Sequence, residues 1–202
     1  RRAKDLATFF VDQSVVDQAA WSADLASRIT PPGSETPAVC VLDTGVSRGH
    51  PLLSLALAEE DVHAANPAWG KADDGGGRSM MGHGTEMAGL ALYGDLAEVL
   101  PASGPVSLQH RLETVKLLPP AGAGATPPAL YGAITATAVS YPETQAPERR
   151  RVFSMAVTAN DYRDRGKPTS WSAAVDALAA GRAFDPSTQG LIYIGASSPK
   201  AK

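Results

Sequence analysis

The feature that most constrains this chain is an unbroken apolar run over residues 38–42, which ends abruptly in Asp43-Thr44-Gly45. A strand with one face in water alternates apolar and polar residues, and this run does not alternate. A short apolar run bounded by Pro37 and a turn is typical of a parallel strand that is buried on both faces. The sequence therefore predicts a sheet with helices on both of its faces.

Strand-like and helix-like segments alternate along the rest of the chain. Further strands are expected over residues 112–118, 152–157 and 191–196, and helices over residues 84–93, 129–141 and 170–181. Parallel strands that are joined by helices form right-handed crossovers. The predicted fold class is therefore α/β, with a doubly wound and mostly parallel sheet flanked by helices.

The beginning of the chain has a different pattern. Residues 5–29 have apolar side chains at helical spacing, and Thr30-Pro31-Pro32-Gly33 ends that helix. We therefore divide the chain into an N-terminal helical extension, residues 1–36, and an α/β domain over residues 37–202.

Composition narrows the classes of partner. The 202 residues carry a net charge of −3, with acidic and basic residues interspersed, so neither a nucleic-acid partner nor a membrane partner is expected. No apolar stretch approaches the roughly 20 residues that span a bilayer.

The basic run Arg149-Arg150-Arg151 is interpreted as a solvated lead-in to the next strand. Cys40 is the only cysteine, and we expect it to be buried as a small apolar residue.

Two residues are candidates for catalysis. Asp43 follows the buried strand, and functional groups gather at the carboxyl edge of parallel sheets; the alternative is that Asp43 only caps a turn. His83 lies between Gly82 and Gly84, which leave its ring accessible. A histidine that a carboxylate orients can take a proton from a nucleophile. The alternative is a histidine with a purely structural role.

These residues lie in two motifs that resemble those of the subtilisin-like serine peptidases, or subtilases. The segment Val41-Leu42-Asp43-Thr44-Gly45-Val46, followed by His50-Pro51, is similar to the aspartate motif of that family. His83-Gly84-Thr85, followed by Ala88-Gly89, is similar to its histidine motif. The order Asp, His, Ser is the order known for subtilisin. The resemblance extends over about residues 37–198.

The resemblance implies a serine-type endopeptidase that hydrolyses peptide bonds through an Asp-His-Ser triad. Asp43 would orient His83, and His83 would act as general base and then general acid. Residues 37–202 would then be the N-terminal portion of a subtilase-like catalytic domain, which is incomplete at the C-terminal side.

The same resemblance implies where an extended polypeptide substrate would bind. Ala156, Val157 and Thr158 correspond to the strand end that pairs with the substrate backbone, and Gly124 belongs to the opposite wall. The alternative is an ordinary strand end and loop. Ser198 stands where the family has the asparagine of its oxyanion hole, and a serine reaches less far than an amide.

A nucleophilic serine is missing from the pattern. The family places its serine in a Gly-Thr-Ser-x-Ala-x-Pro setting, and the nearest match is Pro168-Thr169-Ser170-Trp171-Ser172-Ala173. That segment precedes the oxyanion strand and lacks the flanking Gly and Pro, so Ser170 or Thr169 is interpreted as a helix cap. We therefore expect the chain alone to be inactive, with the missing C-terminal part of the catalytic domain as its partner.

Other classes of function remain as alternatives. A non-catalytic peptide-binding or interaction module on the same fold is the main one. A metal-dependent hydrolase is the second, because Asp73 and Asp74 accompany Asp43, His50 and His83. Their spacing fits neither a zinc-protease helix nor an EF-hand, so Asp73-Asp74-Gly75 is interpreted as a solvated loop. No cofactor is expected; subtilases often bind structural calcium, but the sequence offers no ligand set to match.

Overall fold

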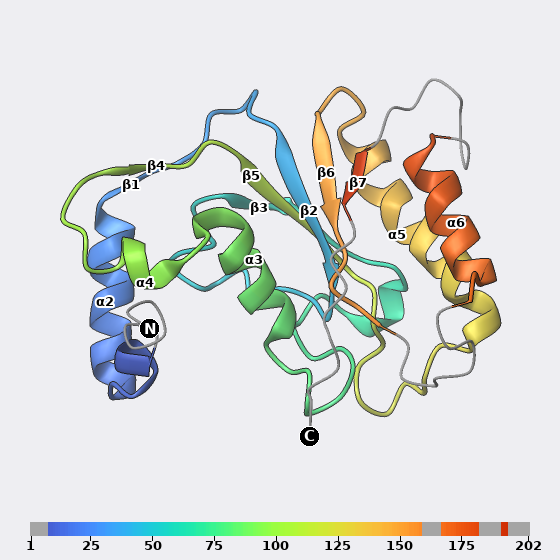
Figure 1. Cartoon of the computed structure of the whole chain (residues 1–202), viewed down its shortest axis with the longest axis horizontal. Coiled ribbons are helices and arrows are strands. Elements are labelled where there is room, and N and C mark those ends of the chain that lie inside the picture. Colours follow the sequence, from blue (N-terminus) through green and yellow to red (C-terminus); the bar gives the residue numbers. More distant parts are fainter. Residues whose placement is uncertain (1–7, 159–166, 182–190, 194–202) are drawn as a thin grey trace.

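The central strand of the sheet is formed by the apolar run. The computed structural model describes residues 8–158, 167–181 and 191–193. In it, β2 (Ala38–Asp43) pairs with β5 (Arg111–Lys116) on one side and with β6 (Arg151–Ser154) on the other. β3 (Leu57–Ala64) and β7 (Leu191–Tyr193) complete a parallel five-stranded sheet of order β3-β5-β2-β6-β7 (Figure 1).

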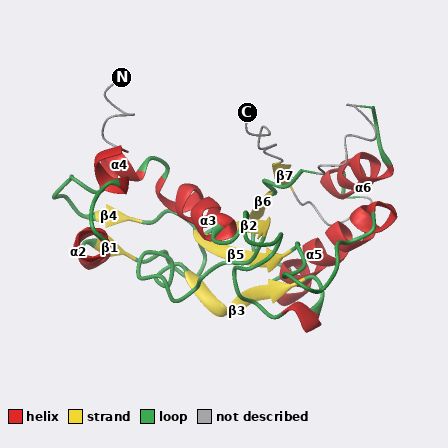
Figure 2. Ribbon diagram, turned by 90° about the horizontal axis from the view of Figure 1, so that it is seen from below, coloured by secondary structure: helices red, strands yellow, loops and turns green. Residues whose placement is uncertain are grey.

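Helices pack on both faces of this sheet. α3 (His83–Tyr93) packs against β2 and β5, while α5 (Tyr131–Gln145) and α6 (Ser170–Ala179) cover the opposite face (Figure 2). The predicted α/β fold with helices on both faces of a parallel sheet is therefore confirmed. Of the helices that the structure describes, none is long and apolar enough to cross a membrane.

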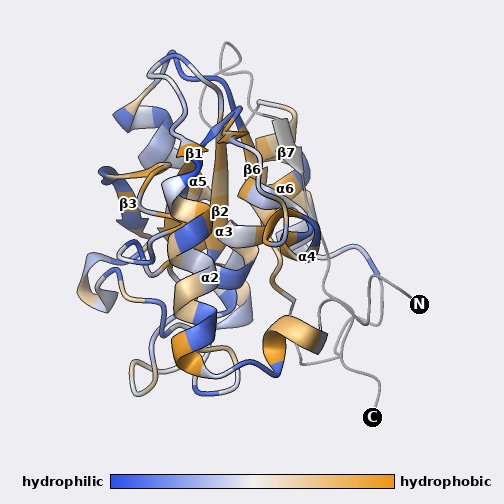
Figure 3. Cartoon of the chain, turned by 90° about the vertical axis from the view of Figure 1, so that its left-hand side faces the viewer, coloured by the Kyte–Doolittle hydropathy of each residue, from blue (hydrophilic) through white to orange (hydrophobic). Residues whose placement is uncertain are grey.

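Side chains of β2 alternate between two hydrophobic cores. Val41 packs on the side of α3, whereas Cys40 and Leu42 pack on the side of α5 and α6. The strand is hydrophobic along most of its length (Figure 3). Cys40 is fully buried, and this burial raises the pKa of its thiol well above the ordinary value. The expectation of a buried, small apolar cysteine is confirmed.

One strand of the sheet, β3, is absent from the sequence-based prediction. Its middle is polar, with Glu59 and Glu60 exposed and Asp61 buried, so it has neither the alternation nor the apolar run of a typical strand. The pairing of β3 with β5 is also interrupted between Leu57 and Val62. β3 lies at an edge of the sheet, where polar residues are tolerated on the outer side.

The N-terminal helix is shorter than predicted. α2 (Val15–Ser27) begins at Ser14, whose hydroxyl accepts a hydrogen bond from the Asp17 amide at 3.2 Å, so the predicted single helix over residues 5–29 is wrong. A serine at this place stops the helix from extending backwards because its side chain replaces the missing helical acceptor. Residues 8–11 form a separate helical turn, and residues 5–7 lie outside the described part.

A small second sheet follows α2. β1 (Ile29–Thr30) pairs in parallel with β4 (Val106–Ser107), so residues 29–30 are strand rather than helix. Arg28 also donates to the carbonyl of Gly104 at 2.7 Å. The start of the chain is thereby attached to the segment that precedes β5.

The remaining elements differ from the prediction mainly at their ends. β5 and β6 stop at Lys116 and Ser154, before the predicted ends at residues 118 and 157, and residues 194–196 lie outside the described part. α5 continues through Pro142 to Gln145 instead of ending at residue 141. Three short helices occupy connections: η1 (Pro67–Trp69), α4 (Leu96–Val99) and η2 (Pro128–Leu130).

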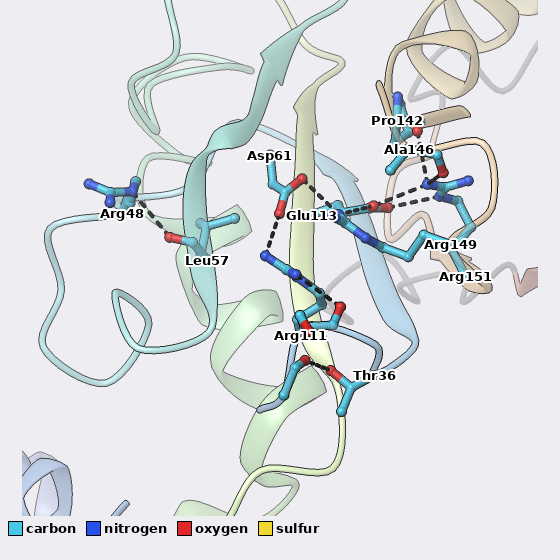
Figure 4. A network of polar contacts seen from close by, with 12 residues as sticks. Thr36, Arg48, Leu57, Asp61, Arg111, Glu113, Pro142, Ala146, Arg149 and Arg151 are labelled. Carbon is cyan, nitrogen blue, oxygen red and sulfur yellow. Dashed lines mark hydrogen bonds and ion pairs between the residues drawn. The ribbon is translucent and has the colours of Figure 1, made fainter. Parts of the chain in front are cut away.

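The basic run before β6 is not a solvated lead-in as predicted. Only Arg150 is exposed, whereas Arg149 and Arg151 form ion pairs with two buried acids (Figure 4). Arg151 donates to both carboxylate oxygens of Glu113, at 2.9 and 3.1 Å, and Arg149 bridges Glu113 and Asp61 at 2.7 Å each. The sequence suggests a solvated run because its acidic partners, Asp61 on β3 and Glu113 on β5, are far away along the chain.

Candidate active site

The two predicted catalytic residues meet at the carboxyl edge of the sheet. Asp43 is the last residue of β2 and His83 is the first of α3. The Nδ1 atom of His83 lies 2.8 Å from the Oδ1 atom of Asp43. The same Oδ1 atom also accepts from the Thr44 amide at 2.7 Å, so Asp43 contacts both the turn that follows it and His83.

Burial raises the pKa of the Asp43 carboxyl and leaves one of its oxygens without a hydrogen-bond partner among the described residues. Its side chain is fully buried, and desolvation raises its pKa, although hydrogen bonds from His83 and from the Thr44 amide oppose this shift. The Oδ2 atom of Asp43 has no hydrogen-bond partner among the described residues. An imidazolium at His83 would therefore be the main compensating charge for the carboxylate.

The orientation of His83 is suited to proton transfer. Because a carboxylate only accepts hydrogen bonds, the contact with Asp43 places the imidazole proton on Nδ1 and leaves Nε2 as the acceptor. The side chain of His83 is 20% exposed, and its Nε2 atom has no protein partner within the described ranges. A group that approaches from solvent can therefore reach this nitrogen.

Glycines on both motifs permit this close approach. A Cβ atom on Gly84 would lie 1.9 Å from the carbonyl oxygen of Gly45, and one on Gly45 would lie 2.3 Å from that of Ala72. Gly45 also has φ of 112°, which side-chain-bearing residues rarely adopt. The beginning of α3 can therefore pack directly on the turn after Asp43 only because Gly84 has no side chain, and Gly45 in turn lets the loop at Ala72 approach that turn.

The interpretation of Asp73-Asp74-Gly75 as a solvated loop is wrong for Asp73 and Gly75, which are buried, whereas the side chain of Asp74 is 45% exposed. Asp73 is 8% exposed, and its carboxylate accepts hydrogen bonds from Thr44 and Thr85, one from each motif. Asp74 forms an ion pair with Lys116, whose side chain is fully buried and also donates to the Trp69 carbonyl at 3.1 Å. The sequence analysis does not predict these contacts, because no local pattern distinguishes the buried Asp73 from its neighbour Asp74.

His50, which follows the aspartate motif, is remote from the hydrogen bonds of the pair. Its Nδ1 atom accepts from the Leu52 amide at 3.3 Å, and burial lowers its pKa. Over residues 8–158, 167–181 and 191–193, no group of three or more His, Cys, Asp or Glu side chains could hold a metal ion.

A cavity of about 370 Å³ lies beside the predicted substrate segment. Gly124, Val157 and Thr158 line it, whereas Ala156 does not. Its other walls include two aromatic side chains, Tyr131 and Trp171, whose ring centres are 5.2 Å apart.

Aromatic residues are therefore a part of the cavity that the sequence-based site omits. The indole of Trp171 donates to the Thr135 hydroxyl at 3.0 Å, and this hydroxyl donates to the Tyr131 carbonyl at 2.7 Å. Their helical spacing on α5 and α6 predicts only a packed face, since the cavity arises where the two helices meet the strand end.

The serine candidates are accounted for in part. Thr169 is the N-cap of α6 and forms a reciprocal capping box with Ser172, so the interpretation of this segment as a cap is confirmed at Thr169. Ser170 is the first residue of the helix rather than its cap. The predicted oxyanion residue, Ser198, lies outside the described residues.

Comparison with known proteins identifies the family. The sequence model of the subtilase family matches residues 34–198, which is most of the chain. Searches of curated proteins and of solved structures returned no significant match. The matched range includes both motifs, every strand of the five-stranded sheet and the three helices that cover it. The chain therefore belongs to the subtilase family.

Proposed function

We propose that Asp43 and His83 are two members of an Asp-His-Ser triad and that the protein is a serine endopeptidase. Membership of the subtilase family supports a serine peptidase in general. The single observation that carries the finer proposal is the 2.8 Å contact between the buried Asp43 carboxylate and His83 Nδ1.

In this proposal His83 transfers the protons. Its Nε2 atom takes the proton of a serine hydroxyl as the serine attacks the peptide carbonyl, and then gives that proton to the leaving amine. Asp43 keeps the tautomer with the proton on Nδ1 and stabilises the imidazolium. The backbone or side chains near Ser198 would stabilise the developing oxyanion, as the family resemblance implies.

The nucleophile in this proposal comes from a further part of the catalytic domain. Apolar side chains on the α3 side of the sheet support this idea: Val152 on β6 is 39% exposed and Leu90 on α3 is 56% exposed. A segment that packed there would bring its own residues to the face from which α3 presents His83.

The substrate in this proposal is an extended polypeptide. Within the described part of the chain, the backbone groups of residues 156–158 form no hydrogen bond, so they are open to a substrate strand. The adjacent cavity has walls of Val157, Tyr131 and Trp171, which suit an apolar side chain of that substrate. Gly124 on the opposite wall leaves room for it.

Labelling with a serine-directed fluorophosphonate tests the triad. The 202-residue chain should remain unlabelled, while a longer version with a downstream Gly-Thr-Ser segment should react, and His83→Ala should abolish that reaction. Exposed Asp95→Ala serves as a control that should react normally, because Asp95 only caps α4. Labelling of a serine within the 202 residues would overturn the proposal.

A non-catalytic peptide-binding module is the second candidate. It is favoured by the cavity, whose walls form without any nucleophile. In that case a longer version would bind extended peptides, would not react with the fluorophosphonate, and would be indifferent to His83→Ala.

A further inference from the structure

We propose that Asp73 is a positioning residue that fixes His83 relative to Asp43. The inference rests on the proposed function of that pair, but it concerns a residue that neither motif contains. Asp73 lies ten residues before His83, on the loop between β3 and α3.

Each oxygen of the Asp73 carboxylate contacts a different motif. Oδ1 accepts a hydrogen bond from the hydroxyl of Thr44, the residue directly after Asp43, at 2.5 Å. Oδ2 accepts from the amide of Thr85, two residues after His83, at 2.8 Å, and also from the Thr85 hydroxyl. A single buried side chain therefore connects the turn that carries the acid to the helix that carries the base.

The two threonine hydroxyls complete the connection in both directions. The Thr44 hydroxyl accepts from the Gly84 amide of α3 at 2.8 Å, and the Thr85 hydroxyl accepts from the Ser47 amide of the acid turn at 2.9 Å. Because each hydroxyl has one proton and gives it to Asp73, its lone pairs are free for the opposite element. Asp73 thereby orients both hydroxyls so that a lone pair of each faces the amide of the opposite element.

The loop that carries Asp73 is itself fixed. The Gly75 amide donates to the Thr44 carbonyl at 3.0 Å, and a Cβ atom on Gly75 would lie 2.6 Å from the Leu118 carbonyl oxygen. Asp74 is held by the buried Lys116. The carboxylate of Asp73 is therefore supported from several sides and does not simply follow the motion of α3.

A carboxylate is the side chain that this position requires. It has two oxygens that only accept hydrogen bonds, and three donors from Thr44 and Thr85 use both of them. Asparagine would offer one oxygen and would turn two donor hydrogens towards other donors. Asp73→Asn should therefore loosen the beginning of α3 while it preserves the volume of the side chain.

The test observes the hydrogen bond between the pair directly. In the full 202-residue chain with ¹⁵N-labelled histidine, the Nδ1 proton of His83 should give a resonance that exchanges slowly with water. Asp73→Asn should increase its exchange rate about tenfold, the factor expected when a hydrogen bond to a charged group is lost. Thr85→Val should have a similar effect, and Thr85→Ser, which keeps the hydroxyl, should restore the slow exchange.

A matched control separates positioning from stability. Glu113→Gln removes a buried acid from the arginine cluster on another part of the sheet, so it should destabilise the fold without accelerating this exchange. If Asp73→Asn does not fold, Thr85→Val against Thr85→Ser decides the question. Wild-type exchange in folded Asp73→Asn, or in Thr85→Val, would overturn the inference alone. A wild-type chain without the Nδ1 resonance would overturn the proposed pair, and the inference with it.

Discussion

Gly84 lies so close to Gly45 that a methyl group on Gly84 would come within 1.9 Å of the Gly45 carbonyl oxygen. This contact joins the aspartate and histidine motifs through their backbones, since Gly84 directly follows His83 and Gly45 lies two residues after Asp43. The distance between the acid and the base is therefore set by how closely two segments without side chains can pack.

Gly84→Ala should consequently destabilise the protein and separate the pair. The obstructing atoms belong to the backbone, so we expect a loss of about 3 kcal/mol in the free energy of unfolding, at the upper end for overpacking. Gly89→Ala on the same helix is the control, because a Cβ atom there meets nothing within 4 Å. It should be neutral or stabilising by up to about 1 kcal/mol. Urea denaturation measures both, and equal effects would contradict the role of the contact.

The arginine run offers a second comparison between neighbouring residues. Arg151→Ala should cost about 3–5 kcal/mol, because it leaves the buried Glu113 short of a partner and removes one of the two donors from each of the Pro142 and Ala146 carbonyls. Arg150→Ala should change the free energy of unfolding by less than about 0.5 kcal/mol, since Arg150 is exposed. Denaturant titration of the two variants distinguishes them, and a small effect at Arg151 would show that the cluster is not stabilising.

The elements that could be predicted from sequence are those with a local signal. β2 is a short apolar run between a proline and a turn, and its burial on both faces follows from that pattern alone. The meeting of Asp43 and His83 follows from the parallel sheet, which brings strand ends and helix starts to one edge.

The parts that could not be predicted depend on partners far away in the sequence. β3 is polar in its middle because Glu59 and Glu60 are exposed to solvent. Its buried acid, Asp61, binds arginines from two other segments, Arg111 and Arg149. Asp73 and Asp74 are adjacent and chemically identical, and only the positions of Thr44, Thr85 and Lys116 determine which contacts each one makes. Such distinctions are made by tertiary contacts.

Asp43→Asn should change how stability depends on pH. Burial raises the pKa of Asp43 above its ordinary value of 3.8, so above that pH the folded protein binds more protons at this site than the unfolded chain does. This carboxyl therefore lowers the stability as the pH rises through that range. Asparagine does not titrate, so Asp43→Asn should be more stable than wild type at neutral pH, and the difference should shrink as the pH falls towards 3.8.

The measurement is chemical denaturation of both proteins across that pH range. Gln145→Ala is a suitable control, because Gln145 is exposed at the end of α5 and does not titrate, so its pH profile should stay parallel to that of wild type. A stability difference for Asp43→Asn that grew towards acidic pH would contradict the effect of burial.

Trp171→Ala should weaken the binding of peptides that place a large apolar side chain in the cavity. The indole forms one wall of the cavity and is held by its hydrogen bond to Thr135. Its removal therefore exposes the apolar side chain of the bound peptide to water. A loss of about 2 kcal/mol, or about 30-fold in Kd, is expected for a leucine-bearing peptide, with little change for its alanine counterpart. Thr135→Val should give an intermediate loss because it frees the indole without removing it. Trp21→Ala, on α2, should leave binding unchanged. Calorimetric titration of the two peptides measures the difference, and an equal loss for both would contradict the assignment of the cavity to an apolar side chain.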